Sequence, residues 1–159
     1  MTATTLADLL SVNARLFANV TTDVADEEAA RRIDGTNSFQ YIAGHYVEIV
    51  CNLALITGQA EANPYTERFG FGTRFDPTGE GYPALSALLA DHAAIAPKVE
   101  AAVRAMSDEQ LAAASPFPLP FAQQTVQGLL AFQQHHLGYT IGQLGLYRRF
   151  LGHEAMGYA

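Results

Sequence analysis

The sequence predicts an all-α four-helix bundle. Apolar residues recur at spacings of three and four along four segments, at about residues 6–20, 42–56, 85–106 and 126–151, which is the period of a helix with one buried face. Alanine and leucine are abundant and tryptophan is absent, a composition typical of helical proteins. We therefore predict a single domain over residues 1–159, in which a long crossover loop joins the second helix to the third.

The limits of these helices follow from residues that favour helix ends. The first helix is expected from its apolar spacing alone. The second should begin after residues 36–38, whose side chains are good caps, and end before Gly58. The third should begin after Pro83, where proline is tolerated, and the fourth should end before Gly152.

The connections carry two further signals. The segment 58–82 is long for a loop in a compact domain, and loops of this length often cover functional sites. Its phenylalanines lie among glycines and are expected either to anchor the loop or to cover the mouth of the bundle: Phe69, Phe71 and Phe75. A capping box at residues 107–110 predicts a short helix that ends before the prolines that follow.

The composition excludes several classes of partner. The formal net charge of −7 would repel nucleic acid and anionic membranes. No basic start with an apolar run is present, and no apolar run is judged long enough to span a bilayer, so we expect neither a signal peptide nor a membrane helix. The single cysteine, Cys51, suits a reducing compartment and is interpreted as a packing residue. We therefore expect a cytoplasmic protein with no nucleic-acid or membrane partner.

Two histidines are placed where a cleft between helices could reach them. His45 in the second helix and His136 in the fourth both fall at the edge of the apolar face of their helix. Histidines at positions i and i+4 of a helix would give a metal two nitrogens from one face, but the residue four positions after His136 is Thr140. The fourth helix therefore has the pattern of a metal site from which one ligand is missing.

Several stretches together resemble the DinB-like (damage-inducible-B-like) superfamily of four-helix bundles. They are residues 37–45, 69–72, 82–83, 142–144 and 148–152. In that family, one histidine of the second helix and two of the fourth bind a divalent metal, usually zinc or nickel. The resemblance implies that His45 and His136 keep these positions and that Thr140 replaces the third histidine.

The resemblance implies zinc or nickel at low occupancy, because two imidazoles alone hold a metal weakly. Three other residues have alternative interpretations. The hydroxyl of Thr140 either orients a water or bonds to a carbonyl of the preceding turn, and Gln143 is either a partner of the metal ligands or a packing amide. His92, on the apolar face of the third helix, is either a replacement ligand or a core histidine.

Three functions fit these expectations. The first, implied by the resemblance, is a divalent-metal-dependent hydrolase or a thiol-dependent transferase with a degenerate metal site. The second is a non-catalytic bundle that binds a small molecule, and the third is a dimeric structural bundle. A homodimer is expected because small residues on one face of the fourth helix let another helix approach, either within the bundle or across a dimer. These residues are Ala131, Gly138, Gly142 and Gly145, with His135 on the same face.

Overall fold

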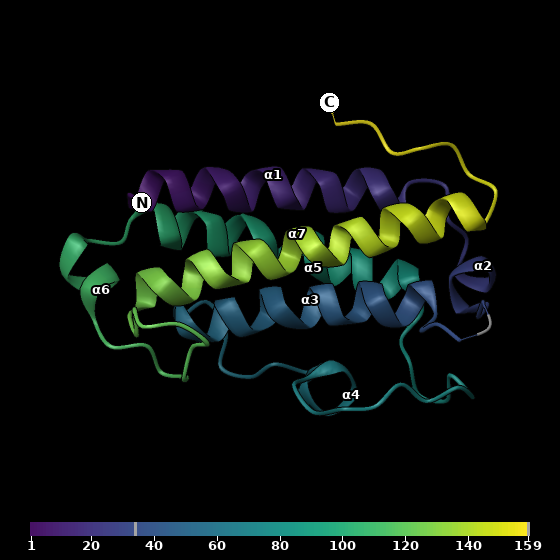
Figure 1. The fold of residues 1–159 in the computed structure, drawn as a ribbon, viewed down its shortest axis with the longest axis horizontal. Helices are drawn as coiled ribbons and strands as arrows, with labels where there is room; N and C mark the ends of the chain where they lie inside the picture. Colours follow the sequence, from purple (N-terminus) through teal and green to yellow (C-terminus); the bar gives the residue numbers. More distant parts are fainter. Residues whose placement is uncertain (34, 159) are drawn as a thin grey trace.

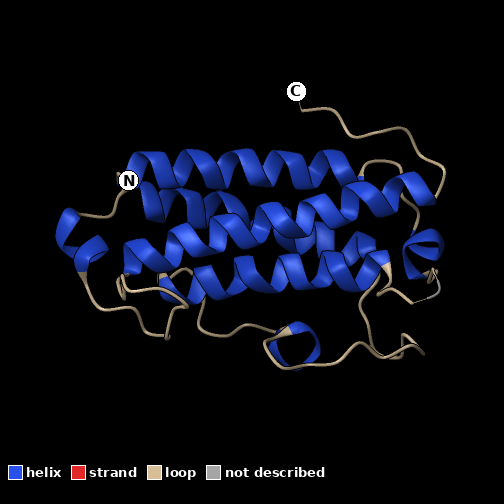
Figure 2. Cartoon of the chain, in the orientation of Figure 1, coloured by secondary structure: helices blue, strands red, loops and turns tan. Residues whose placement is uncertain are grey.

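The computed structural model describes residues 1–33 and 35–158. Within these residues, four long helices pack side by side, and three short helices lie in the connections (Figure 1). The long helices are Ala3–Thr21 (α1), Phe39–Ile56 (α3), Leu85–Arg104 (α5) and Val126–Phe150 (α7). The short ones are Asp26–Ala30 (α2), Thr66–Phe69 (α4) and Asp108–Ala112 (α6). Within the described residues no strand is present (Figure 2), so the all-α four-helix prediction is confirmed.

The long crossover loop determines the order of the helices. It returns along the outside of the bundle and carries α4, so α3 and α5 run in the same direction (Figure 1). α3 packs against both α5 and α7, and α1 packs against the same two helices. Because α4 contacts α3, the loop can reach side chains of that helix.

Side-chain caps form where the sequence predicts them. At the start of α3, the hydroxyl of Ser38 accepts a hydrogen bond from the amide of Tyr41. At α6, the predicted capping box forms between Ser107 and Gln110. These bonds satisfy amides that the first turn of a helix leaves without a partner.

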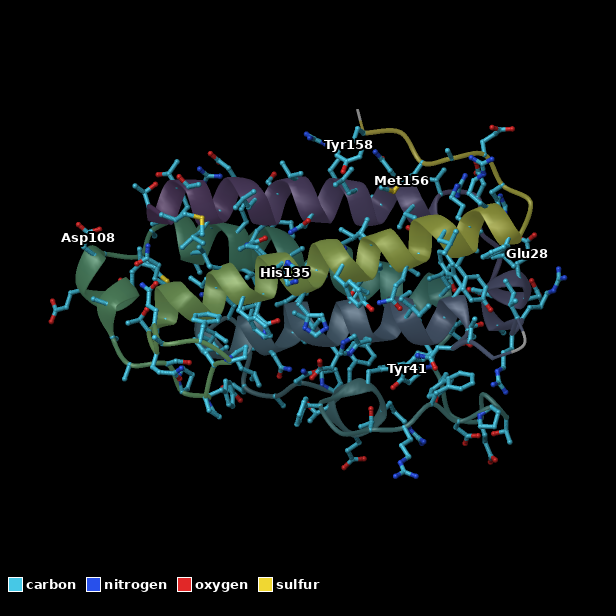
Figure 3. The ribbon with its side chains drawn as sticks, viewed as in Figure 1. Glu28, Tyr41, Asp108, His135, Met156 and Tyr158 are labelled. Atoms are coloured by element: carbon cyan, nitrogen blue, oxygen red, sulfur yellow. The ribbon has the colours of Figure 1, made fainter. Side chains whose placement is uncertain are left out.

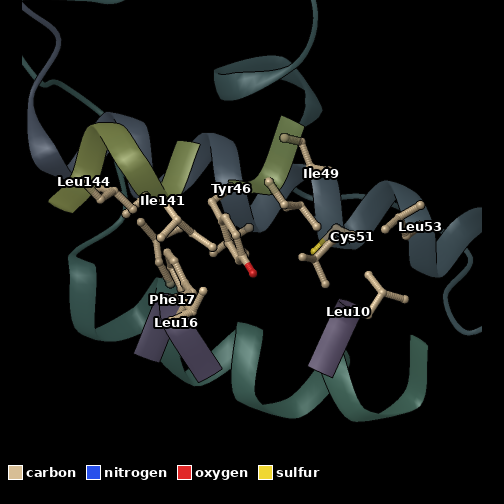
Figure 4. Close-up of a cluster of buried hydrophobic side chains, with 14 of the residues drawn as sticks. Leu10, Leu16, Phe17, Tyr46, Ile49, Cys51, Leu53, Ile141 and Leu144 are labelled. Atoms are coloured by element: carbon tan, nitrogen blue, oxygen red, sulfur yellow. The ribbon is translucent and has the colours of Figure 1, made fainter. Parts of the chain in front are cut away.

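The core is a cluster of buried side chains from all four long helices, part of which is drawn in Figure 4. Phe17 of α1 stacks on Tyr46 of α3 with ring centroids 4.0 Å apart, and His92 of α5 meets the edge of Phe17. Cys51 is also buried, and burial raises the pKa of its thiol to about 11. A thiol with a raised pKa is a poor nucleophile, which supports its interpretation as a packing residue.

The expectation about membrane helices needs a correction. α3 is 18 residues long and, by length and composition alone, apolar enough to cross a bilayer. However, 72% of it is buried inside the bundle. An apolar composition on nearly all sides is typical of a helix that packs against several others, so contact with protein accounts for it here.

Two glycines on the outer face of α7, Gly138 and Gly142, have no packing role within the described chain. A Cβ atom added to Gly138 or Gly142 would meet no other atom within 4 Å. Leu146, which follows Gly142 by one turn, is 61% exposed. Close approach inside the bundle therefore does not explain these two glycines, and packing across a dimer stays a prediction.

We expect Gly142→Leu to disrupt a homodimer without unfolding the chain. The new side chain has free space on one protomer, but it would separate two α7 helices that meet at this position. Size-exclusion chromatography with light scattering should show a dimer for the unmodified protein and a monomer for the variant. Ala94→Leu, on the exposed face of α5, is the control and should stay dimeric. A monomeric unmodified protein at high concentration contradicts this prediction.

Candidate functional site

His45 of α3 and His136 of α7 meet across the interface between the two helices. Their Nε2 atoms are 3.1 Å apart and their ring centroids are 5.0 Å apart, so the two imidazoles share a hydrogen bond. Both residues are partly buried. The structure thus brings together the two histidines that the sequence places at the edges of their apolar faces.

The crossover loop fixes the orientation of His45. The Nδ1 atom of His45 lies 2.9 Å from the carbonyl oxygen of Phe69, at the end of α4. Phe69 can approach because residue 44 is glycine: a Cβ atom on Gly44 would lie 2.3 Å from the Phe69 ring. The same ring packs on Tyr41, labelled in Figure 3, and on Tyr82. Phe69 therefore anchors the loop on α3, one of the two roles expected for the loop phenylalanines.

Gly44→Ala is expected to displace Phe69 and so release His45. The added methyl group would overlap ring atoms, and overpacking of this kind costs about 1–3 kcal/mol in the free energy of unfolding. Urea unfolding measures this loss, and the NMR resonances of the His45 imidazole should report the lost carbonyl bond. Ala94→Ser is the control, because it adds one heavy atom on the exposed face of α5. It should change the free energy of unfolding by no more than about 0.5 kcal/mol. Equal effects of the two substitutions would refute the role of Gly44.

The histidine pair lines a cleft of about 260 Å³ between α3, α7 and the loop that follows α4. The lining residues are Asn37, Tyr41, Ile42, His45, Phe69, Gly70, Gly72, Thr73, His136, Tyr139, Thr140 and Gln143. This set contains no lysine, arginine, aspartate or glutamate. Its polar groups are side-chain amides, hydroxyls, imidazoles and peptide groups of the backbone. These groups select a ligand by hydrogen bonding rather than by charge.

Thr140 and Gln143, the two other predicted residues on α7, also line the cleft. Thr140 is only 1% exposed, and its hydroxyl donates to the carbonyl oxygen of His136 at 2.9 Å. This bond corresponds to the interpretation of Thr140 as a helix-interior threonine bonded to the preceding turn. Gln143 offers its amide to the cleft about two turns beyond His136.

His92 does not line the cleft. Its ring lies in the core against Phe17 and Tyr46, and its Nε2 atom is buried without a hydrogen-bond partner in the part of the chain that is described. Burial lowers the pKa of His92 to about 4, so its ring is neutral at pH 7. His92 is therefore a core histidine and is not placed to replace a ligand beside His45.

Electrostatic effects act on both sides of the pair. Burial lowers the pKa of His136, and the imidazoles of His45 and His135 lower it further.

Glu48, one turn after His45, is buried, and burial raises the pKa of its carboxyl group. Its side-chain and backbone oxygens accept hydrogen bonds from Asn63 of the crossover loop. Glu48 thus ties the start of this loop to α3.

Sequence reasoning missed several contributors to the site, and three of them show why. Thr73 and Tyr139 line the cleft, and the carbonyl group of Phe69 orients His45. A backbone carbonyl has no sequence signature, and the position of Thr73 depends on the tertiary path of its loop. Tyr139 had a usable signal, because it follows His136 by three residues and so shares its side of α7.

The pair matches only part of a metal centre. Two nitrogens on a tetrahedral zinc ion are separated by roughly 3.4 Å, close to the 3.1 Å between the Nε2 atoms. However, within residues 1–33 and 35–158 no group of three histidine, cysteine, aspartate or glutamate side chains is arranged to hold a metal. The hydroxyl of Thr140 is already bonded to a carbonyl. These residues therefore do not fit the three-imidazole centre that the family resemblance implies.

The fold and the site define the class of protein, an all-α bundle with a histidine-lined cleft between two of its helices. A family model described as the DinB superfamily matches residues 9–144, a range that contains both histidines of the pair. The chain belongs to the DinB superfamily. A comparison with curated proteins gave no match. Membership establishes the fold and family but carries no particular activity with it.

Proposed function

We propose that the protein binds a small uncharged molecule in the cleft between α3 and α7, with the His45–His136 pair as the main recognition group. The composition of the cleft carries this proposal: a hydrogen-bonded imidazole pair is surrounded by amides and hydroxyls, with no charged side chain in the lining. An ionised ligand group would lose hydration there without gaining a charged partner. The amides of Asn37 and Gln143 suit the donors and acceptors of a neutral ligand.

An exposed aromatic ring in the lining of the cleft favours a ligand that includes an apolar ring. Tyr139 lines the cleft and yet is 63% exposed, so its ring offers an uncovered apolar face. A ligand ring that stacks on Tyr139 would bury apolar surface and gain aromatic contact. The volume of about 260 Å³ limits the occupant to a small molecule.

Benzamide and benzoate are a matched pair of probes, because they share a ring and differ in charge. Their binding to the full-length protein can be followed by NMR chemical-shift changes. We expect benzamide to perturb cleft residues and to bind about tenfold more tightly than benzoate, a difference of about 1.4 kcal/mol. Tyr139→Ala should weaken benzamide binding, whereas Leu146→Ala, equally exposed on α7 but outside the cleft lining, should not. Tighter binding of benzoate, or shifts confined to other surfaces, would reject the proposal.

A metal-dependent enzyme is the second candidate, and the 3.1 Å separation of the Nε2 atoms favours it. In this alternative the pair takes up zinc or nickel at low occupancy, and the protein is a hydrolase or a thiol-dependent transferase, as the family resemblance implies. Such a metal would supply Lewis-acid chemistry. The carbonyl of Phe69 would hold His45 in place, as outer partners of metal-binding histidines do. This candidate ranks second because only two imidazoles are present.

A further inference from the structure

The hydrogen bonds of the histidine pair determine where its protons lie. A carbonyl oxygen only accepts, so the Nδ1 atom of His45, 2.9 Å from the carbonyl oxygen of Phe69, carries a proton. A neutral imidazole has a single N–H, and the Nε2 atom of neutral His45 is therefore an acceptor. Its partner at 3.1 Å, the Nε2 atom of His136, must then donate. It follows that neutral His136 has its free lone pair on Nδ1.

This lone pair is available to a ligand. Among the described residues, the buried side-chain nitrogens and oxygens that lack a hydrogen-bond partner are His92 Nε2 and Gln133 Oε1. The Nδ1 atom of His136 has no partner either but does not belong to this buried set, so solvent reaches it. Because His136 lines the cleft, a molecule bound there can approach the same atom.

We propose that the Nδ1 atom of His136 is the hydrogen-bond acceptor of the cleft and that His45, held by the carbonyl of Phe69, is its positioning residue. The arrangement needs no metal ion. It rests on the proposed function, because the bound ligand supplies the donor. The ligand class is thereby narrowed to neutral molecules that carry an N–H or O–H group beside an apolar part.

The carbonyl of Phe69 restrains rotation of the His45 ring, so the acceptor for the Nε2–H group of His136 is in place before a ligand binds. The lone pair of His136 is thereby kept on Nδ1, where it can accept an N–H or O–H group of the ligand without a change of tautomer.

Long-range proton–nitrogen NMR of the metal-free, full-length protein reads both tautomers directly. We expect His45 to be protonated on Nδ1 and His136 on Nε2. His45→Leu should leave His136 as a mixture of tautomers, because the acceptor is lost. His45→Gln, whose amide oxygen can accept the same bond, should preserve the tautomer of His136. Protonation of His136 on Nδ1 in the unmodified protein would overturn the proposal.

Alkylation by iodoacetamide, a small uncharged reagent, tests whether the lone pair is reachable and held on Nδ1. We expect Nδ1 of His136 to displace iodide about twofold faster in the unmodified protein than in His45→Leu, because a mixture of tautomers would leave the lone pair on Nδ1 for only part of the time. His45→Gln should restore part of this rate. His135 is exposed and outside the pair, so its rate is the internal control and should be the same in all three proteins. Equal rates at His136 in all three would overturn the proposal.

The binding of an uncharged molecule in the cleft and the acceptor role of His136 can be rejected independently of each other. Benzamide binding together with reversed tautomers would reject the hydrogen-bond acceptor and keep the binding function. The expected tautomers and alkylation rates together with no benzamide binding would reject the binding function, while supporting Nδ1 of His136 as an accessible acceptor in the cleft.

Discussion

Thr140→His is expected to turn a weak metal site into a tight one. The substitution places imidazoles at positions i and i+4 of α7, opposite His45, and so directs three nitrogens to one region. Position 140 can present a third ligand to this region, because Thr140 lines the same cleft as the histidine pair. Since metal would bind the folded protein, zinc at about 100 times its Kd should add about 2.7 kcal/mol to the free energy of unfolding. The corresponding rise in Tm is roughly 5–10 °C for a chain of this length.

Thermal melts with and without added zinc measure this effect, and calorimetric titration gives the affinity. Thr140→Val is the matched control, because it removes the hydroxyl group without adding a ligand, and it should gain no stability from zinc. The melt of the metal-free histidine variant shows whether the larger side chain is tolerated. A folded histidine variant that gains no more from zinc than the unmodified protein would contradict the prediction.

Acid is expected to destabilise the bundle through His92, by on the order of 3 kcal/mol. The residue is 7% exposed, and burial lowers the pKa of its imidazole from 6.5 to about 4. Between these two values the unfolded chain binds a proton that the folded protein does not. The contribution of neutral His92 is therefore fully present above about pH 6.5 and is lost as the pH falls towards about 4.

His92→Leu isolates this effect, because leucine packs in the apolar surroundings of Phe17 and Tyr46 and does not titrate. Urea unfolding of both proteins at pH 7 and at acid pH should show the variant gaining stability relative to the unmodified protein as the pH falls. The carboxyl groups of Asp26 and Asp76 have lowered pKa values, so their protonation also weakens the fold in acid. Their contribution is the same in both proteins and is removed when the two free energies of unfolding are subtracted. A difference that is constant with pH would show that His92 does not titrate in this way.

Local sequence signals predicted the long helices because each depends on residues close together in the chain. Apolar periodicity located α1, α3, α5 and α7, and the cap at Ser38 fixed the start of α3. α2 and α4 were not predicted, since helices of five and four residues are too short to show a helical period of apolar residues. The glycines of α7 were recognised as a face, but only the structure shows that nothing in the described chain covers Gly138 and Gly142.

The candidate site was predictable only in part. His45 and His136 could be assigned to the correct faces, and the family resemblance paired them. His92 shows the limit of this reasoning, because an inward direction on α5 leads to a core shared with α1 and α3 and does not lead to the cleft on α7. The bond from His45 to Phe69 joins residues 24 positions apart through a loop, so no local pattern reports it.

The metal content of the unmodified protein, purified without a histidine tag, most directly tests the central claim that a two-histidine pair forms this site. Elemental analysis by mass spectrometry should find zinc and nickel together well below one atom per chain, because the described residues offer two imidazoles and no third ligand. Benzamide binding should be unchanged after treatment with a chelator. Stoichiometric metal that survives dialysis, and that is lost in both His45→Gln and His136→Gln, would contradict the claim.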